Sequence, residues 1–191
     1  EKRNFEAVLQ TIASGKLRVK EMVSEVVDLD DYLRIYGDIG HSRSIASILK
    51  YRADASLSHT VRLKSTSFAK STGVAGIVGS GNFTKMTMLP ALKDTSVHLK
   101  YIASNGGVTG TALAQKHSIA NSTTDYREIL RDAEVDLVMI TTRHHLHATM
   151  VVESLQAGKN VFVEKPLALN RSELEQIIAA QQSAGKTLTV G

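Results

Sequence analysis

The sequence contains no cysteine, only two prolines and no long hydrophobic run. Without cysteine the chain can form no disulfide, bind no zinc through thiolates and perform no thiol catalysis, and this composition gives slight support for a reducing compartment. No apolar stretch approaches the length of a membrane span, and no signal-peptide pattern opens the chain. We therefore expect a cytoplasmic protein without a membrane partner.

The charge balance is mild. The chain carries 23 basic and 19 acidic residues, a formal charge of +4, and no basic stripe is interleaved with aromatic side chains, which make up 5% of the residues. Nucleic acid is therefore disfavoured as a partner. A length of 191 residues with 42% hydrophobic and 22% charged residues is typical of one globular domain with an appendage.

A glycine-bearing stretch organises the chain. An apolar run from Val74 to Val78 passes into Gly79-Ser80-Gly81 and then into a helical pattern. This layout is typical of a dinucleotide phosphate site, in which the first glycine permits a tight turn and the second lets a pyrophosphate approach the backbone. Thr84 stands where such motifs often have a third glycine. Taken alone, the motif leaves a plain glycine turn open.

The rest of the chain supplies the context for this motif. After residue 73, strand-like and helix-like segments alternate with short connections, which predicts an α/β fold with a doubly wound parallel sheet. The predicted strands are Val74–Val78, Val97–Ala103, Val135–Thr141, Asn160–Val163 and Leu188–Val190. The first predicted helix follows Gly81, with Phe83, Met86, Leu89 and Leu92 on one stripe and a bend at Pro90. The other four predicted helices cover 110–117, a short segment that begins near Asp125, 148–157 and 170–184.

The first part of the chain reads differently. Residues 1–52 indicate a mixed extension with a helix from Asn4 to Ser14, a strand within 19–27, a short helix after Asp30 and a segment, 44–50, that is ambiguous between strand and helix. Residues 53–72 are polar and rich in serine and threonine, and we interpret them as a linker. The dinucleotide-binding domain is predicted to span 73–191.

Ligands of parallel sheets bind at the carboxyl ends of the strands. Lys165 ends one predicted strand, and Pro166 favours an extended backbone that directs the ammonium into the crevice, where it can hydrogen-bond a substrate hydroxyl. Glu164 can orient an amide or a ribose. A surface Glu-Lys pair that ends a strand is an equally weighted alternative.

Further candidates follow two other strands. His144, His145 and His147 invite a metal hypothesis, but no nearby carboxylate has suitable spacing, and we predict no metal site. We expect His147 to face the crevice. Thr141 and Thr142 can offer hydroxyl groups to a nicotinamide ribose, although ordinary strand-end capping is an alternative.

Ser104 ends the second strand, where an acidic residue usually binds the ribose hydroxyls of NAD. Because the chain has no acid there and no closely following arginine, the choice between NAD and NADP stays open.

Several stretches together resemble the glucose–fructose oxidoreductase / inositol dehydrogenase / MocA family. The resemblance covers about residues 73–191, and its most specific part is the run Ala157-Gly158-Lys159-Asn160-Val161-Phe162-Val163-Glu164-Lys165-Pro166. Gly79-Ser80-Gly81-Asn82, Leu89-Pro90-Ala91-Leu92 and the 141–148 segment add to it. Two departures are Arg143 in place of a common proline and Ser104 in place of a common acid.

The resemblance implies a Rossmann domain of an NAD- or NADP-dependent oxidoreductase that moves hydride between nicotinamide and a sugar or polyol hydroxyl. It assigns catalytic roles to Lys165 and His147. The expected cofactor contacts are Gly79, Gly81, Asn82, Phe83, Ser104, Thr141, Thr142, His144, Glu164 and Lys165. It also implies a C-terminal substrate domain, which this chain would lack, and a homo-oligomer formed mainly through that domain.

Other interpretations remain beside this one. Residues 3–33 loosely resemble the C-terminal tail of medium-chain, alcohol-dehydrogenase-like reductases, which would make the chain an inactive middle part of a two-enzyme fusion; a helical extension packed on the next domain is the alternative. The whole protein could instead be a non-catalytic Rossmann-fold sensor or scaffold. A module for subunit association is a weaker third reading.

Overall fold

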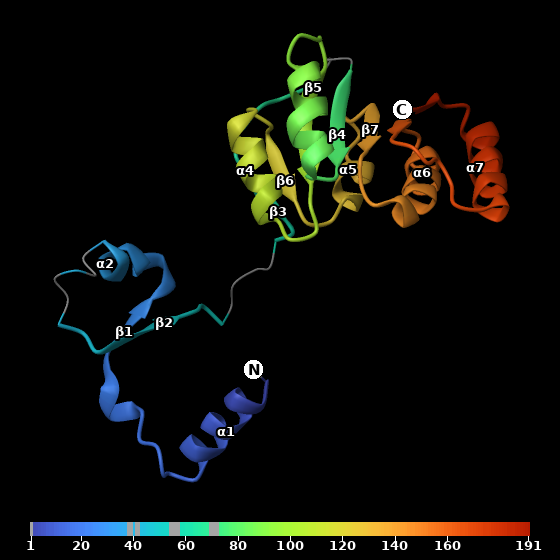
Figure 1. Ribbon diagram of the computed structural model, residues 1–191. Helices are drawn as coiled ribbons and strands as arrows, with labels where there is room; N and C mark the ends of the chain where they lie inside the picture. Colours follow the sequence, from blue (N-terminus) through green and yellow to red (C-terminus); the bar gives the residue numbers. More distant parts are fainter. Residues whose placement is uncertain (1, 38–39, 41–42, 54–57, 69–72) are drawn as a thin grey trace. The chain divides into compact units, whose positions relative to one another are not determined.

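The computed structural model describes residues 2–37, 40, 43–53, 58–68 and 73–191. The chain divides into two compact units, Glu1–Leu57 and Ser58–Gly191. Figure 1 shows the elements of both units.

The N-terminal unit contains little buried apolar material. Its two strands, β1 and β2, pair in parallel, and Val27 is the one buried hydrophobic residue among the described residues of this unit. The ambiguous 44–50 segment is therefore a strand. The elements are α1 (Lys2–Ala13), η1 (Lys20–Met22), β1 (Val23–Asp28), η2 (Leu29–Asp31), α2 (Tyr32–Tyr36) and β2 (Ala46–Lys50). A sheet of two strands is marginally stable by itself, which agrees with the small core.

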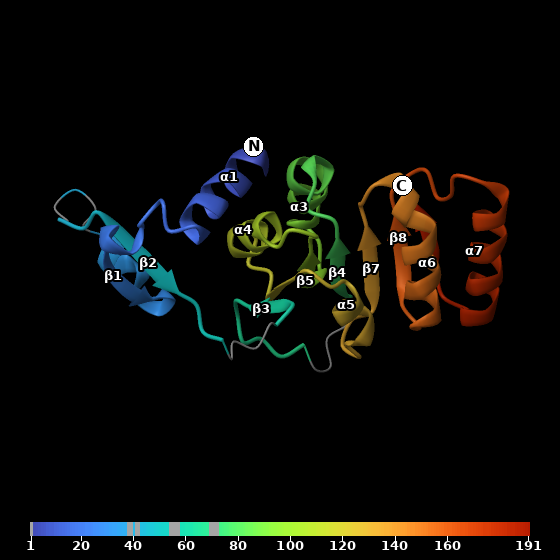
Figure 2. The same ribbon diagram turned by 90° about the horizontal axis from the view of Figure 1, so that it is seen from below.

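The second unit is built on a seven-stranded sheet with the order β3-β6-β5-β4-β7-β8-β9, in which only the edge pair β3–β6 is antiparallel. The six parallel strands thus follow the order 3-2-1-4-5-6, which is the doubly wound order of dinucleotide-binding domains. Figure 2 shows β5, β4, β7 and β8 in this succession. The strands are β3 (Thr60–Arg62), β4 (Val74–Val78), β5 (His98–Ala103), β6 (Asn121–Thr123), β7 (Leu137–Ile140), β8 (Asn160–Val163) and β9 (Leu188–Val190).

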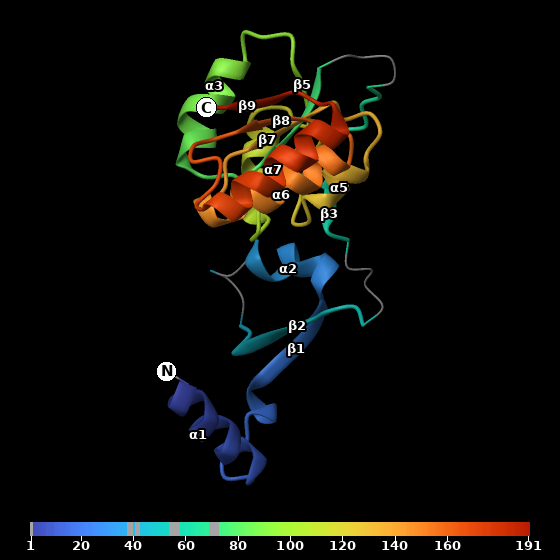
Figure 3. The ribbon, with the colours of Figure 1, turned by 90° about the vertical axis from the view of Figure 1, so that its right-hand side faces the viewer.

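Helices cover both faces of this sheet. Alternate residues of β4 point to opposite sides: Val74 and Val78 join one core cluster, whereas Ala75 and Ile77 join the other. Figure 3 shows α6 and α7 in front of β7, β8 and β9. The helices are η3 (Thr84–Met88, a π-helical turn), α3 (Leu89–Leu92), α4 (Val108–Lys116), α5 (Arg127–Arg131), η4 (His144–Leu146), α6 (His147–Gln156) and α7 (Arg171–Ala184). The predicted α/β fold with a doubly wound sheet is confirmed.

Capping residues explain why the ends of several helices agree with those predicted from the sequence. The Asn170 side chain accepts a hydrogen bond from Glu173 N at 3.0 Å, which starts α7, and Gly185 ends it in the left-handed conformation with φ +61°. Gly158, with φ +75°, follows α6 in the same way. The bounds of β4, β8 and β9 agree with the predicted strands.

Two predictions in this unit are wrong in whole or in part. Part of the predicted linker is strand β3, in which Thr60 pairs with Thr123 of β6; nothing in the local sequence reveals a partner 63 residues away. The predicted stripe of the first helix is half right: Leu89 is buried and Leu92 packs against the same core, but Phe83 and Met86 are exposed, and Thr84 and Met88 are buried in their place. A π-helical turn has more residues per turn than the α-helix that the stripe assumed, so it changes the phase of the buried face.

Candidate functional site

A cavity of about 680 Å³ lies at the carboxyl ends of β4, β5, β6 and β7. This is the edge at which doubly wound sheets bind ligands. Five of the residues predicted from the sequence line it: Gly79, Gly81, Ser104, Thr141 and Thr142. Further polar residues line the cavity that are not among the predicted site residues: Ser80, Asn105, Thr124, Asp125, Tyr126, Arg127, Arg143 and His145.

The two glycines of the motif differ in what a side chain at each position would contact. Gly79 has φ +119°, and a Cβ there would lie 2.6 Å from Thr141 Oγ1 and 2.9 Å from the Thr141 carbonyl. A Cβ on Gly81 would meet nothing within 4 Å. The fold therefore requires glycine at 79, whereas the small residue at 81 leaves open space in front of a helix N-terminus, where first-turn N–H groups lack intrahelical acceptors. This open cradle fits a pyrophosphate group.

Thr84, at the position of the missing third glycine, is completely buried. Its hydroxyl donates to the Gly79 carbonyl at 3.0 Å and lies 2.7 Å from Thr141 Oγ1. Thr141 Oγ1 also lies 3.2 Å from the Val78 carbonyl oxygen. The hydroxyl of Thr141 thus has partners within the protein, the Thr84 hydroxyl and the Val78 and Gly79 carbonyls, and its contact with a ribose stays a prediction. Through its contacts with Gly79 and Thr141, Thr84 connects the glycine turn to the end of β7.

Ser104 is also held from within the protein. Its Oγ accepts a hydrogen bond from Gly110 N at 3.2 Å, and a Cβ on Gly110 would come within 2.5 Å of that oxygen. The next residue, Asn105, is exposed and lines the same cavity. At the end of β5, therefore, the side-chain amide of Asn105 is more accessible to a ligand than the hydroxyl of Ser104.

The cavity wall beyond β6 is ordered by an aromatic and ionic cluster. Tyr126 donates its hydroxyl proton to Glu153 at 2.6 Å, and burial followed by this carboxylate raises the Tyr126 pKa to about 12. Arg127 pairs with the same carboxylate at 3.0 Å and lies 5.0 Å from the centre of the Tyr126 ring. Asp125 accepts a hydrogen bond from Arg127 N at 3.0 Å. These contacts hold the side chains of this wall in place.

His147 does not face the crevice, so that prediction is wrong. The ring is fully buried, with Nδ1 2.8 Å from the carbonyl oxygen of Pro166 and Nε2 3.0 Å from that of Thr142. Because both nitrogens face backbone carbonyls, neither is available to a substrate. The ring instead joins the loop after β7 to the loop after β8.

Lys165 is exposed and pairs with Glu164, as in the alternative to an ammonium that faces the crevice. Its side chain is 79% exposed, and its ammonium lies 3.8 Å from the carboxylate of Glu164, whose own side chain is only 17% exposed. The peptide bond between Lys165 and Pro166 is cis. Neither residue of this ion pair lines the cavity described above, and the same holds for Asn82, Phe83 and His144, all of which are exposed.

The most specific run of the sequence is in large part structural. Lys159 is buried, and its ammonium donates to the carbonyl oxygens of Asp132 at 2.7 Å and Val135 at 2.9 Å. It thereby binds the end of α5 to the start of β8. This contact and the left-handed Gly158 together place the strand that ends at Glu164 and Lys165.

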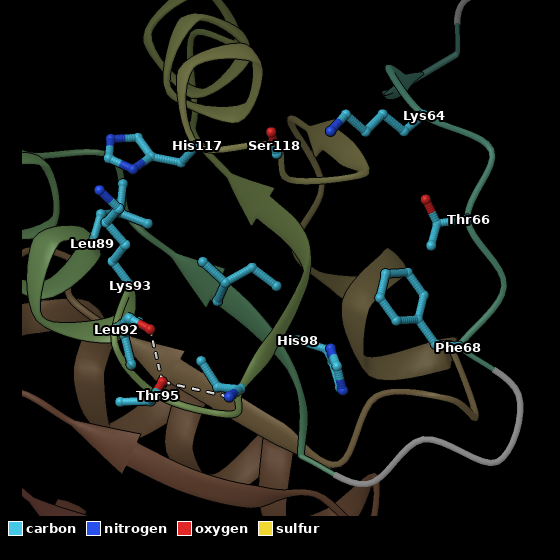
Figure 4. Close-up of a pocket in the computed structure, with 12 residues that line it drawn as sticks. Lys64, Thr66, Phe68, Leu89, Leu92, Lys93, Thr95, His98, His117 and Ser118 are labelled. Atoms are coloured by element: carbon cyan, nitrogen blue, oxygen red, sulfur yellow. Dashed lines mark hydrogen bonds between the residues drawn. The ribbon is translucent and has the colours of Figure 1, made fainter.

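Further cavities lie elsewhere on this unit. A second cavity, of about 420 Å³, lies at the opposite edge of the sheet (Figure 4). In the part of the chain that the structure describes, no three His, Cys, Asp or Glu side chains gather as metal ligands. No helix among the described residues combines the length and the apolar character that crossing a membrane requires.

Comparisons with known proteins agree with this architecture. Residues 74–191 match the model of the GFO/IDH/MocA group, described as an oxidoreductase family with an NAD-binding Rossmann fold. Inositol 2-dehydrogenase of Salmonella typhimurium is 36% identical over 117 residues, which are 60% of this chain and 34% of that enzyme. The 1,5-anhydro-D-fructose reductase of Ensifer adhaerens is 28% identical over 113 residues, 59% of this chain and 34% of the enzyme.

A solved structure gives the same result. The 3-ketoreductase KijD10 of Actinomadura kijaniata, in complex with NADP and TDP-benzene, superposes with a TM-score of 0.58 at 26% identity, covering 62% of this chain and 36% of that one. The chain thus spans about a third of the length of the relatives it matches. None of these findings supports the predicted likeness of residues 3–33 to a reductase tail.

Proposed function

Since the chain belongs to the GFO/IDH/MocA family of oxidoreductases, we propose that residues 73–191 bind NAD or NADP for hydride transfer to or from a CH–OH group of a sugar or polyol. Two of the similar relatives are named for a polyol and a sugar derivative, inositol and 1,5-anhydro-D-fructose. The observation that carries the proposal is the cradle at Gly81, where the absent Cβ leaves open space beside the cavity at the carboxyl ends of the strands.

The residues present fit a dinucleotide. The turn at Gly79 and Gly81 with the following helix N-terminus would hold the pyrophosphate, and the wall formed by Asn105, Tyr126 and Arg127 would receive the adenosine end. A bound nicotinamide supplies or accepts the hydride. Ser104 and Asn105 present no carboxylate that would repel a 2′-phosphate, so both cofactor forms remain within the proposal.

We assign Lys165 the role of the group that contacts the substrate hydroxyl. Its exposed ammonium can donate a hydrogen bond to the reacting oxygen and stabilise negative charge there as the C–H bond breaks. Glu164 holds the ammonium from one side without burying it. His147 then acts as a positioning residue, because its ring fixes the carbonyl of Pro166 next to Lys165.

Fluorescence titration with NADH and NADPH tests cofactor binding. The chain should bind at least one form, and Gly81→Ala should weaken binding while leaving the melting temperature unchanged, since the added Cβ meets no protein atom. Gly40→Ala is the matched control, because an added Cβ there also meets nothing within 4 Å. Absence of binding up to millimolar concentrations, or equal effects of both substitutions, would contradict the proposal.

The catalytic part is tested in the protein as its gene encodes it. A panel of sugars and polyols should reveal dehydrogenase activity, and Lys165→Ala should lower kcat/KM by about 100-fold or more, as loss of acid–base contacts does in other enzymes. Activity that survives Lys165→Ala would remove Lys165 from the mechanism. Tight sugar binding without turnover would favour the sensor alternative.

A further inference from the structure

The second cavity of the Rossmann unit lies at the amino ends of the strands. His98 begins β5, and His117 and Ser118 follow α4. A strand of six residues places this edge roughly 17 Å from the carboxyl edge that holds the glycine turn. The two cavities are therefore separate, and the second, at about 420 Å³, has the size of a small-molecule site. We call it the basal cavity.

The titratable side chains that line the basal cavity are all basic. Lys64, Lys93, His98 and His117 line it, and no Asp or Glu does. Within the described part of the chain, neither lysine has an acidic partner, whereas the nearby Lys100 is paired with Asp132 and Glu134. Two unneutralised ammonium groups beside one hollow raise the local positive potential and attract an anion.

The lining also offers neutral donors and an apolar wall. Figure 4 shows Lys64 extending toward Ser118 and Lys93 extending toward His117. Neither Thr66 nor Ser118 has a side-chain hydrogen bond among the contacts of the described residues. Phe68, Leu89, Leu92 and Leu99 supply hydrophobic surface. A ligand that uses all these groups has an anionic end with several oxygen acceptors and an apolar body.

We propose that the basal cavity binds a small organic phosphate, with Lys64 and Lys93 neutralising the dianion and the apolar wall receiving the organic part. A phosphate suits the cavity better than a carboxylate, because two ammonium groups and two free hydroxyl groups match its double charge and its three terminal oxygens. This site is independent of the dinucleotide cavity.

The pKa of His117 can indicate whether a ligand is bound in the basal cavity. Burial, followed by the positive charges of Lys116 and Lys93, lowers the His117 pKa, and no acidic group opposes these effects. Lys64 and His98 line the cavity opposite and add no negative charge. A bound dianion would stabilise the imidazolium, so phosphate binding should raise the His117 pKa.

NMR titration of the whole chain with phenyl phosphate tests this inference. We expect saturable shifts of the His117 and His98 ring signals, none at the exposed His59, and a rise of the His117 pKa by about half a unit or more. Inorganic phosphate, which lacks an organic body, should bind more weakly. Equal affinity of the two probes would refute the role of the apolar wall.

Substitutions separate this cavity from other phosphate sites. Lys64→Gln combined with Lys93→Gln should weaken phenyl phosphate about tenfold or more, as loss of two charge-assisted contacts would. Arg171→Gln, which removes one exposed positive charge at the start of α7, should have no effect. Shifts that occur only at the Gly79–Gly81 turn, or that persist in the double variant, would overturn the proposal.

Discussion

The position of His147 leads to a sharp prediction about stability. Its ring is fully buried and lies within hydrogen-bonding distance of two backbone carbonyls from different loops. His147→Ala would leave a cavity, would remove the donor of at least one buried carbonyl, and would separate the loop after β7 from the loop after β8. The expected cost comes mainly from the cavity and the lost donor, reduced by whatever relaxation follows.

Truncation of a large buried side chain costs about 2–5 kcal/mol, and a buried acceptor that loses its donor costs about 1–3 kcal/mol. Since neighbouring effects are not additive, we expect His147→Ala to lower the free energy of unfolding by about 3–5 kcal/mol, a large fraction of the roughly 5–15 kcal/mol of an ordinary domain. Urea denaturation followed by far-UV circular dichroism measures this loss.

His145, two positions before the start of α6, provides a matched control. It is exposed and makes no buried contact, so His145→Ala should change stability by less than about 0.5 kcal/mol. His147→Asn should recover part of the loss, because its amide can still donate to one carbonyl. Hydrogen exchange in His147→Asn should increase in residues 142–146 and 165–168 and stay constant in β4. Equal losses for the two alanine variants would refute the proposed bridge.

Three further predictions follow from single contacts. Thr84→Val, which keeps the volume but removes the hydroxyl, should cost about 0.5–1.5 kcal/mol in urea denaturation, because the Gly79 carbonyl loses its 3.0 Å donor and keeps only Thr141 Oγ1 at 3.3 Å; an unchanged midpoint would contradict this. Gly110→Ala should destabilise the domain through contact with Ser104 Oγ, and Ser104→Ala should recover part of the loss in a double-mutant cycle. Burial opposes ionisation of Asp132, but hydrogen bonds, led by the one from Lys100, outweigh burial and lower the Asp132 pKa below 3.8. The stability that this carboxylate contributes is therefore present above pH 3.8 and should disappear as the pH falls through the folded-state pKa. Asp132→Asn should flatten this part of the pH–stability curve.

The sequence by itself determined the elements whose signals are local. The apolar run of β4, the cap and left-handed glycine of α7, and the short strands β8 and β9 were predictable because neighbouring residues along the chain encode them. The alternation of these elements also fixed the parallel sheet, and with it the edge at which the cofactor cavity lies.

Only the tertiary structure decided the contacts between distant segments. Residues 60–62 form β3 because they pair with β6. His147 is buried because two backbone carbonyls from separate loops lie within hydrogen-bonding distance of its ring. The Thr84–Thr141 contact likewise joins groups 57 residues apart. A one-dimensional pattern shows which residue types can make such contacts but not which partners will be present, since partners are brought together by packing of the whole sheet. For the same reason the basal cavity, formed by four segments of the chain, left no motif in the sequence.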